Sequence, residues 1–149
     1  MRGPLFISIG EVNQLIQPNM KHIINFTSAF LGLVFVVFGL NFFFKFIAIP
    51  QPPHDSPAAM FMGGMFVSGF LAFVKVLEIL GGVCLVFPPL RNLGLLILGP
   101  IIVNIVAFNF FFFGPAGLLQ LPVLIVSVLA LIQVIAAHRS FLNFITHKN

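Results

Sequence analysis

The sequence predicts an all-α integral membrane protein, a four-helix bundle. Of its 149 residues, 60% are hydrophobic and 7% are charged, whereas soluble globular domains carry about 25% charged residues. Mean hydropathy is +1.16. Four apolar runs reach the roughly 20 residues that a helix needs to cross a bilayer; they lie at about 23–47, 60–87, 93–113 and 118–137.

Turn-forming and polar residues separate these runs, at 50–57, 88–92 and 114–117. Short connections of this kind place consecutive helices antiparallel in a bundle, so we expect a single membrane domain. Residues 1–22 carry polar side chains before the first long apolar run, unlike a cleaved signal peptide. We therefore expect them to be retained as an interfacial segment, and we expect residues 138–149 to form a short tail.

Basic residues gather on one side of the predicted bundle. Lys45 is the only one on the opposite side, whereas five fall on the side that holds both termini: Arg2, Lys21, Arg91, Arg139 and Lys148. By the positive-inside rule this side faces the cytoplasm. The pattern predicts an integral membrane protein with cytoplasmic N- and C-termini.

The same composition argues against several other classes of protein. The basic residues are scattered singly, so they form no stripe along which a nucleic acid backbone could lie. Cys84 is the only cysteine, which excludes an internal disulfide and a CxxC dithiol. We expect no metal and no intrinsic cofactor. The expected partners are the lipid bilayer and either other membrane subunits or further copies of this chain.

Lys75 and Glu78 are the unusual feature, because they lie inside the second apolar run. Each charge at a helix centre costs about 2.5–3.5 kcal/mol on insertion scales. Intramembrane ionisable residues of this kind usually face the bundle interior and mark functional sites. At a spacing of three residues the two side chains can form an ion pair on one helix face.

Lys75 and Glu78 share one predicted face of the second helix with Gly64, Ser68, Leu71 and Gly82. Small residues allow helices to approach closely in lipid, so we expect this face to lie inside the bundle. Counting about 1.5 Å per residue puts Asn104 and Ser127 near the centres of the third and fourth helices.

Two polar groupings follow from this count of depth. Lys75, Glu78, Asn104 and Ser127 are expected to form an intramembrane cluster, and Asn41 and Asn109 a second polar layer toward the outer face. Two interpretations of the cluster remain open. The first is a structural ion pair, and the second is the lining of a site for an apolar ligand with a polar head, such as a quinone.

Three blocks of sequence carry a resemblance to a known family: Leu31–Phe35 with Gly39–Asn41, Lys75–Gly82, and Pro100–Ile105. They resemble the DoxX-like family of small four-helix membrane proteins, and the Lys-x-x-Glu-x-x-Gly-Gly pattern is the most specific part. Members include subunits of a thiosulfate:quinone oxidoreductase and components of membrane redox complexes. Phe42 and Asn109 stand where similar sequences often carry Lys and His, which disfavours proton-coupled catalysis by this chain.

The resemblance implies a membrane subunit associated with a quinone-linked electron-transfer assembly, without a redox cofactor of its own, in the bacterial cytoplasmic (inner) membrane. The alternatives are a non-catalytic accessory subunit of a larger respiratory or photosynthetic complex and a small transporter or channel. Four tightly packed helices leave little room for a pore. Whether the chain is an enzyme is left open by the sequence.

Overall fold

The computed structural model describes the backbone of residues 9–146 and the side chains of residues 19–138, and every regular element within that range is helical. In chain order the elements are α1 (Ile9–Phe44), α2 (Pro57–Val67), α3 (Phe70–Val86), the short 3-10 helix η1 (Pro88–Leu90), α4 (Arg91–Leu118) and α5 (Leu121–Thr146). Three of the described helices are long and apolar enough to cross a membrane, or up to four if the bent pair α2–α3 counts as one span. The prediction of an all-helical chain with membrane-length apolar helices is confirmed.

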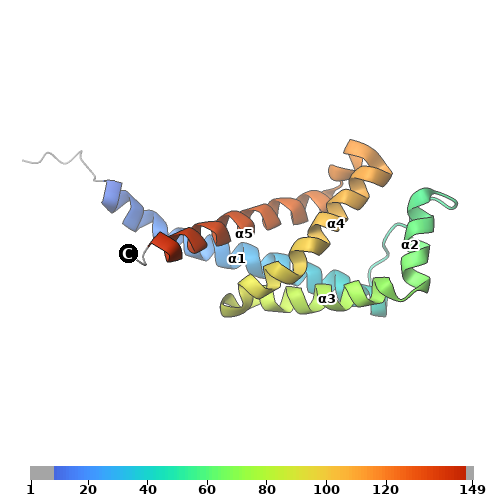
Figure 1. Cartoon of the computed structure of the whole chain (residues 1–149), viewed down its shortest axis with the longest axis horizontal. Coiled ribbons are helices and arrows are strands. Elements are labelled where there is room, and N and C mark those ends of the chain that lie inside the picture. Colours follow the sequence, from blue (N-terminus) through green and yellow to red (C-terminus); the bar gives the residue numbers. More distant parts are fainter. Residues whose placement is uncertain (1–8, 147–149) are drawn as a thin grey trace, which may run out of the picture.

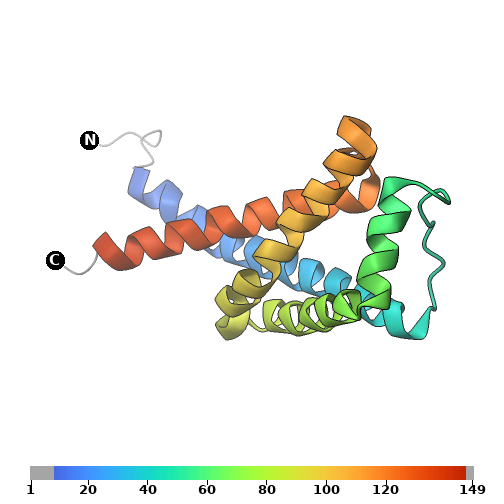
Figure 2. The same ribbon diagram turned by 45° about the vertical axis from the view of Figure 1, so that its right-hand side comes forward.

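Each long helix packs against the next one, and the last packs against the first. The longest shared interface joins α1 to α3, then α3 packs on α4, α4 on α5, and α5 returns to α1. Figures 1 and 2 show α5 running beside α1 while α4 crosses obliquely from the end of α3 to the start of α5. Leu31, Leu85 and Leu98, from three different helices, are fully buried at the centre.

Glycines allow α1 and α3 to touch at the backbone. A Cβ on Gly82 would lie 2.6 Å from the carbonyl oxygen of Gly32, and a Cβ on Gly32 would lie 2.5 Å from that of Gly82. Because lipid offers apolar side chains as good an environment as the protein does, close packing of this kind is a main source of helix association in membranes. The part of the predicted face that contains Gly82 therefore packs against α1, inside the molecule as expected.

The prediction of one helix over 60–87 is wrong, because α2 and α3 meet at an angle of 82°. Gly69 has φ +77°, a left-handed conformation that costs a residue with a Cβ roughly 1–2 kcal/mol. The hydroxyl of Ser68 donates to the carbonyl of Met65 and accepts from the amide of Phe70, so the break keeps its polar groups bonded. Ser68 is exposed, and a Cβ added to Gly64 would meet nothing within 4 Å. Neither residue therefore packs inside the molecule with Gly82, as the predicted face required.

The other helix boundaries shift by smaller amounts. The first helix begins at Ile9, so the described part of the expected 1–22 segment continues as helix into the span. The last helix runs to Thr146, through most of the expected tail. In α4 the chain leaves helical geometry at Gly114 (φ +67°) and resumes it from Pro115 to Leu118, within the turn expected at 114–117.

Candidate functional site

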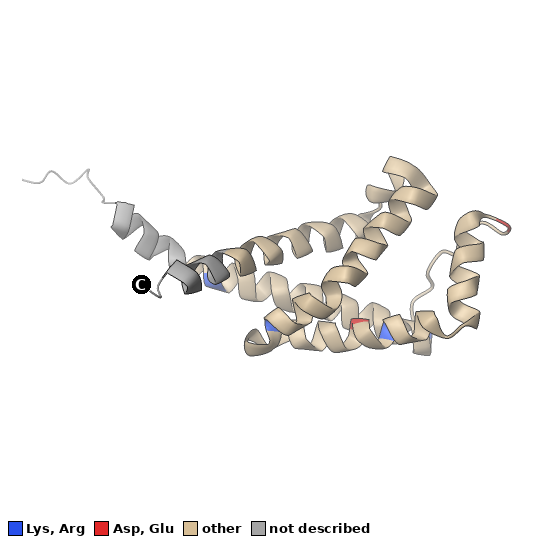
Figure 3. Ribbon diagram, viewed as in Figure 1, with Lys and Arg blue, Asp and Glu red and all other residues tan. Residues whose placement is uncertain are grey.

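Lys75 and Glu78 form an ion pair on α3. Lys75 Nζ donates to both carboxylate oxygens of Glu78, at 2.9 Å to Oε1 and 2.8 Å to Oε2. The carboxylate is buried, with 4% of its side chain exposed, whereas 22% of the Lys75 side chain remains accessible. Charged residues are sparse in the described part of the chain (Figure 3). The Lys75–Glu78 pair is the only ion pair between the described side chains. The predicted pairing is therefore present.

Lys75 also lines a cavity of about 910 Å³. The end of α1, the connection that follows it, α2 and the start of α3 border this space, which is open on one side, and most of the lining is apolar. Its polar groups are Asn41, Lys45, Gln51, His54 and Lys75. Ligand pockets typically combine a largely apolar wall with a few polar groups and measure about 300–1,000 Å³, so this cavity has the character of a site for an apolar ligand.

The break at Gly69 creates this cavity by turning α2 away from the line of α3. Aromatic contacts hold α2 in its place: the rings of Phe42 and Phe66 meet edge to face at 6.0 Å, and Phe61 packs on Phe108 and Phe112 at 5.8 and 5.5 Å. Such ring pairs contribute about 0.5–1.5 kcal/mol each beyond their buried area. Val67 and Leu71, on either side of the break, both line the cavity.

Asn104 and Ser127 do not join the pair. Asn104 is exposed, and its side chain has no hydrogen bond to another described residue. Ser127 Oγ donates to the carbonyl of Val123 on its own helix, at 2.7 Å. The expectation of a four-residue cluster is wrong for these two residues. Counting along a helix gives the depth of a residue but not the direction in which it faces, and the oblique course of α4 changes that direction.

Asn41 and Asn109 are both buried, but each bonds to its own part of the chain. Asn41 Nδ2 donates to the carbonyl of Ile47 at 3.0 Å, and Asn41 Oδ1 accepts from the amide of Ile47 at 2.6 Å. Asn109 Nδ2 donates to the carbonyl of Ile105 at 2.8 Å. No hydrogen bond joins the two residues in the described part of the chain, so the expected second layer consists of two separate local contacts.

Replacing Asn41 with alanine is expected to lower the free energy of unfolding by about 1–2 kcal/mol, because the variant loses two hydrogen bonds that contribute about 0.5–1.5 kcal/mol each. The change removes both bonds that hold Ile47 against the end of α1, so the cavity wall at 45–56 should also become more sensitive to protease. Thermal unfolding in detergent and limited proteolysis measure the two effects. Asn104→Ala, which removes an exposed and unbonded amide, is the matched control and should change neither.

Several residues of the cavity were not predicted from the sequence, notably Gln51 and His54 in the connection before α2 and Phe66 on α2. The connection could have indicated the first two, because it is the longest and most polar in the chain. Long loops in compact domains are often functional. Within the residues that the structure describes, no three His, Cys, Asp or Glu side chains lie together as a metal site would require.

Comparison with known proteins adds no relative. The chain matches no family model, and neither curated proteins nor solved structures give a significant match. The geometry of the cavity and of the ion pair is therefore the basis on which a function can be proposed.

Proposed function

We propose that this chain is a membrane subunit of a quinone-linked electron-transfer assembly, without a redox cofactor of its own, and that it binds a quinone in the cavity lined by Lys75. The resemblance of three sequence blocks to the DoxX-like family suggested this class of protein. The large, mainly apolar cavity beside the Lys75–Glu78 pair supports the choice of ligand.

One observation carries the proposal, namely the unused hydrogen-bond capacity of Lys75. An ammonium group has three N–H donors, and Glu78 accepts from two of them. Among the described residues the third has no acceptor, and the Lys75 side chain lies in the cavity wall. A quinone carbonyl is an acceptor on an otherwise apolar molecule. Glu78 fixes the ammonium in place, and the rings of Phe42 and Phe66 offer apolar surface to the rest of the ligand.

We further infer that α1, the α2–α3 pair, α4 and α5 each form one crossing of a four-helix bundle with both termini in the cytoplasm. Lys21 and Arg91 line a common cavity at one end, whereas Lys45 and His54 line the larger cavity at the other. This separation supports the topology expected from the positive-inside rule. It would make the quinone site open toward the outer half of a bacterial inner membrane.

A soluble short-chain quinone is expected to raise the melting temperature of the purified protein by about 5–10 °C at 100 times its Kd, from the linkage relation and the thermal response of a domain this size. A matched hydrocarbon without carbonyl groups should raise it much less, since it cannot accept from Lys75. The absence of any shift at saturating quinone, together with no redox partner after gentle purification, would refute the proposal.

A second candidate is a non-catalytic accessory subunit that packs on a larger membrane complex or on further copies of itself. The observation in its favour is an exposed face of α2 that does not line the cavity, where Met60 is 68% exposed and a Cβ added to Gly64 would meet nothing within 4 Å. Small residues of this kind suit helix–helix contact in lipid. Purification in mild detergent tests this candidate, because a protein that migrates only as a free monomer does not have such a partner.

A further inference from the structure

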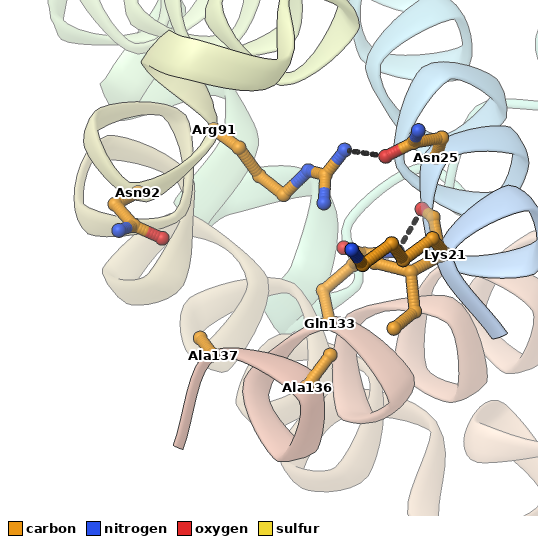
Figure 4. Close-up of a pocket in the computed structure, with 8 residues that line it drawn as sticks. Lys21, Asn25, Arg91, Asn92, Gln133, Ala136 and Ala137 are labelled. Carbon is orange, nitrogen blue, oxygen red and sulfur yellow. Dashed lines mark hydrogen bonds between the residues drawn. The ribbon is translucent and has the colours of Figure 1, made fainter. Parts of the chain in front are cut away.

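A second cavity, of about 160 Å³, lies at the opposite end of the molecule between α1, α4 and α5. Figure 4 shows that Lys21 and Asn25 approach it from α1, Arg91 and Asn92 from α4, and Gln133 from α5. A water molecule takes about 30 Å³ in the liquid, so the cavity has room for a group of several heavy atoms. Its polar lining differs sharply from the apolar lining of the cavity beside Lys75.

Two buried polar atoms at this cavity have no partner in the described part of the chain. Gln133 is fully buried, and its Nε2 donates to the carbonyl of Ile24 and to Thr27 Oγ1, while its Oε1 accepts nothing. Arg91 donates through Nη2 to Asn25 Oδ1, but its Nε–H is unpaired. Buried polar groups in proteins are nearly always hydrogen-bonded. One unpaired donor and one unpaired acceptor at the same cavity therefore point to a ligand.

The cavity also carries positive charge without a described counter-ion. Lys21 and Arg91 both line it, and the only ion pair among the described side chains is the distant one between Lys75 and Glu78. Arg and Lys side chains are the usual partners of phosphate oxygens, and the Nε–H of Arg91 is unpaired. Gln133 Oε1 is an unpaired acceptor, so the ligand should also contain a hydrogen-bond donor.

The position of the cavity suits a lipid headgroup. Lys21, Arg91 and Ala137 each lie within a few residues of the end of a candidate span, at Asn19, Pro88 and His138. Exposed apolar side chains flank the site on the same helices, with Ile23, Leu93 and Val134 each about half exposed or more. Basic pockets between helices at this depth commonly hold phospholipid headgroups.

We propose that this cavity binds a phosphate group that carries a hydrogen-bond donor, the chemistry of a phosphatidylglycerol or phosphatidylethanolamine headgroup and of dihydrogen phosphate. Arg91 Nε and the Lys21 ammonium donate to the phosphate oxygens. Gln133 Oε1 accepts from the glycerol hydroxyl, the ethanolamine ammonium or the phosphate hydroxyl. This site is separate from the proposed quinone cavity and does not depend on it.

Native mass spectrometry of the full chain in detergent, with added lipid, tests the proposal. Phosphatidylethanolamine and phosphatidylcholine have the same net charge, but only the first has a donor on its headgroup, so the first is expected to bind about tenfold more tightly. Phosphatidylglycerol, which adds a net negative charge, should bind at least as tightly. Lys21→Gln and Arg91→Gln should each weaken phosphatidylglycerol binding about tenfold, while Lys45→Gln at the other end leaves it unchanged.

Inorganic phosphate distinguishes the two sources of the ligand. If millimolar phosphate displaces phosphatidylglycerol and forms its own adduct, free phosphate is the ligand; if it does not, the ligand is the lipid. Either result supports the site provided that Arg91→Gln weakens binding of that ligand about tenfold. Wild-type affinity in Arg91→Gln overturns the proposal, and so does equal binding of phosphatidylethanolamine and phosphatidylcholine when phosphate forms no adduct of its own.

Discussion

Replacing Lys75 with methionine is expected to lower the free energy of unfolding by about 3–5 kcal/mol, the usual result of removing one partner of a buried ion pair. The carboxylate of Glu78 is almost completely buried, and both of its oxygens accept from Lys75 alone among the described residues. The reverse change, Glu78→Gln, should cost less because Lys75 still reaches the cavity. Thermal or denaturant unfolding in one detergent measures both variants.

The double variant Lys75→Met/Glu78→Gln should recover most of the stability lost in Lys75→Met, because neither change then leaves a buried charge unpaired. Lys45→Met is the matched control, since Lys45 also lines the cavity but has no ion pair in the described structure. It should change stability by less than about 0.5 kcal/mol. If Lys75→Met is as stable as Lys45→Met, the ion pair has no structural role.

Gly82→Ala is expected to destabilise the protein by about 1–3 kcal/mol, the cost of overpacking a tight interface. The new Cβ would meet the carbonyl oxygen of Gly32 at 2.6 Å and the amide nitrogen of Val36 at 3.1 Å. These are backbone atoms, so α1 and α3 would have to separate along their interface.

Gly64→Ala supplies the matched comparison, because it is the same chemical change in a helix where a Cβ would meet nothing within 4 Å. It should stabilise the protein by about 0.4–1 kcal/mol through the smaller entropy of the unfolded chain. Melting temperatures of the two variants should therefore move in opposite directions. Equal shifts would show that α1 and α3 do not approach each other at Gly82.

The sequence allowed the helical spans to be predicted because length and hydropathy alone decide whether a segment can cross a membrane. The pairing of Lys75 with Glu78 was predictable for a similar reason, since a spacing of three residues fixes their distance on any helix. The break at Gly69 was not predictable, because Ser68 and Gly69 are small residues that also occur inside membrane helices. Only the positive φ at Gly69 distinguishes the two cases.

The prediction that Asn104 and Ser127 cluster with the ion pair failed for a different reason. A residue's depth depends on its position in its own helix, but its direction depends on how that helix is rotated against its neighbours. That rotation is set by contacts such as Gly81 on Leu98 and Gly94 on Leu85, which join residues on different helices. The cavity residues Gln51 and His54 were missed because a loop's course depends on such contacts as well.

Quinone affinity of the double variant Lys75→Met/Glu78→Gln tests the central claim most directly, because this variant should keep the fold while losing the ammonium donor. A short-chain quinone is titrated against the wild type and against the double variant, under conditions in which the two proteins are equally stable. The titrations give the two Kd values. We expect the double variant to bind at least about tenfold more weakly, the effect of one charge-assisted hydrogen bond. Equal affinity would contradict the assignment of Lys75 as the donor to the ligand.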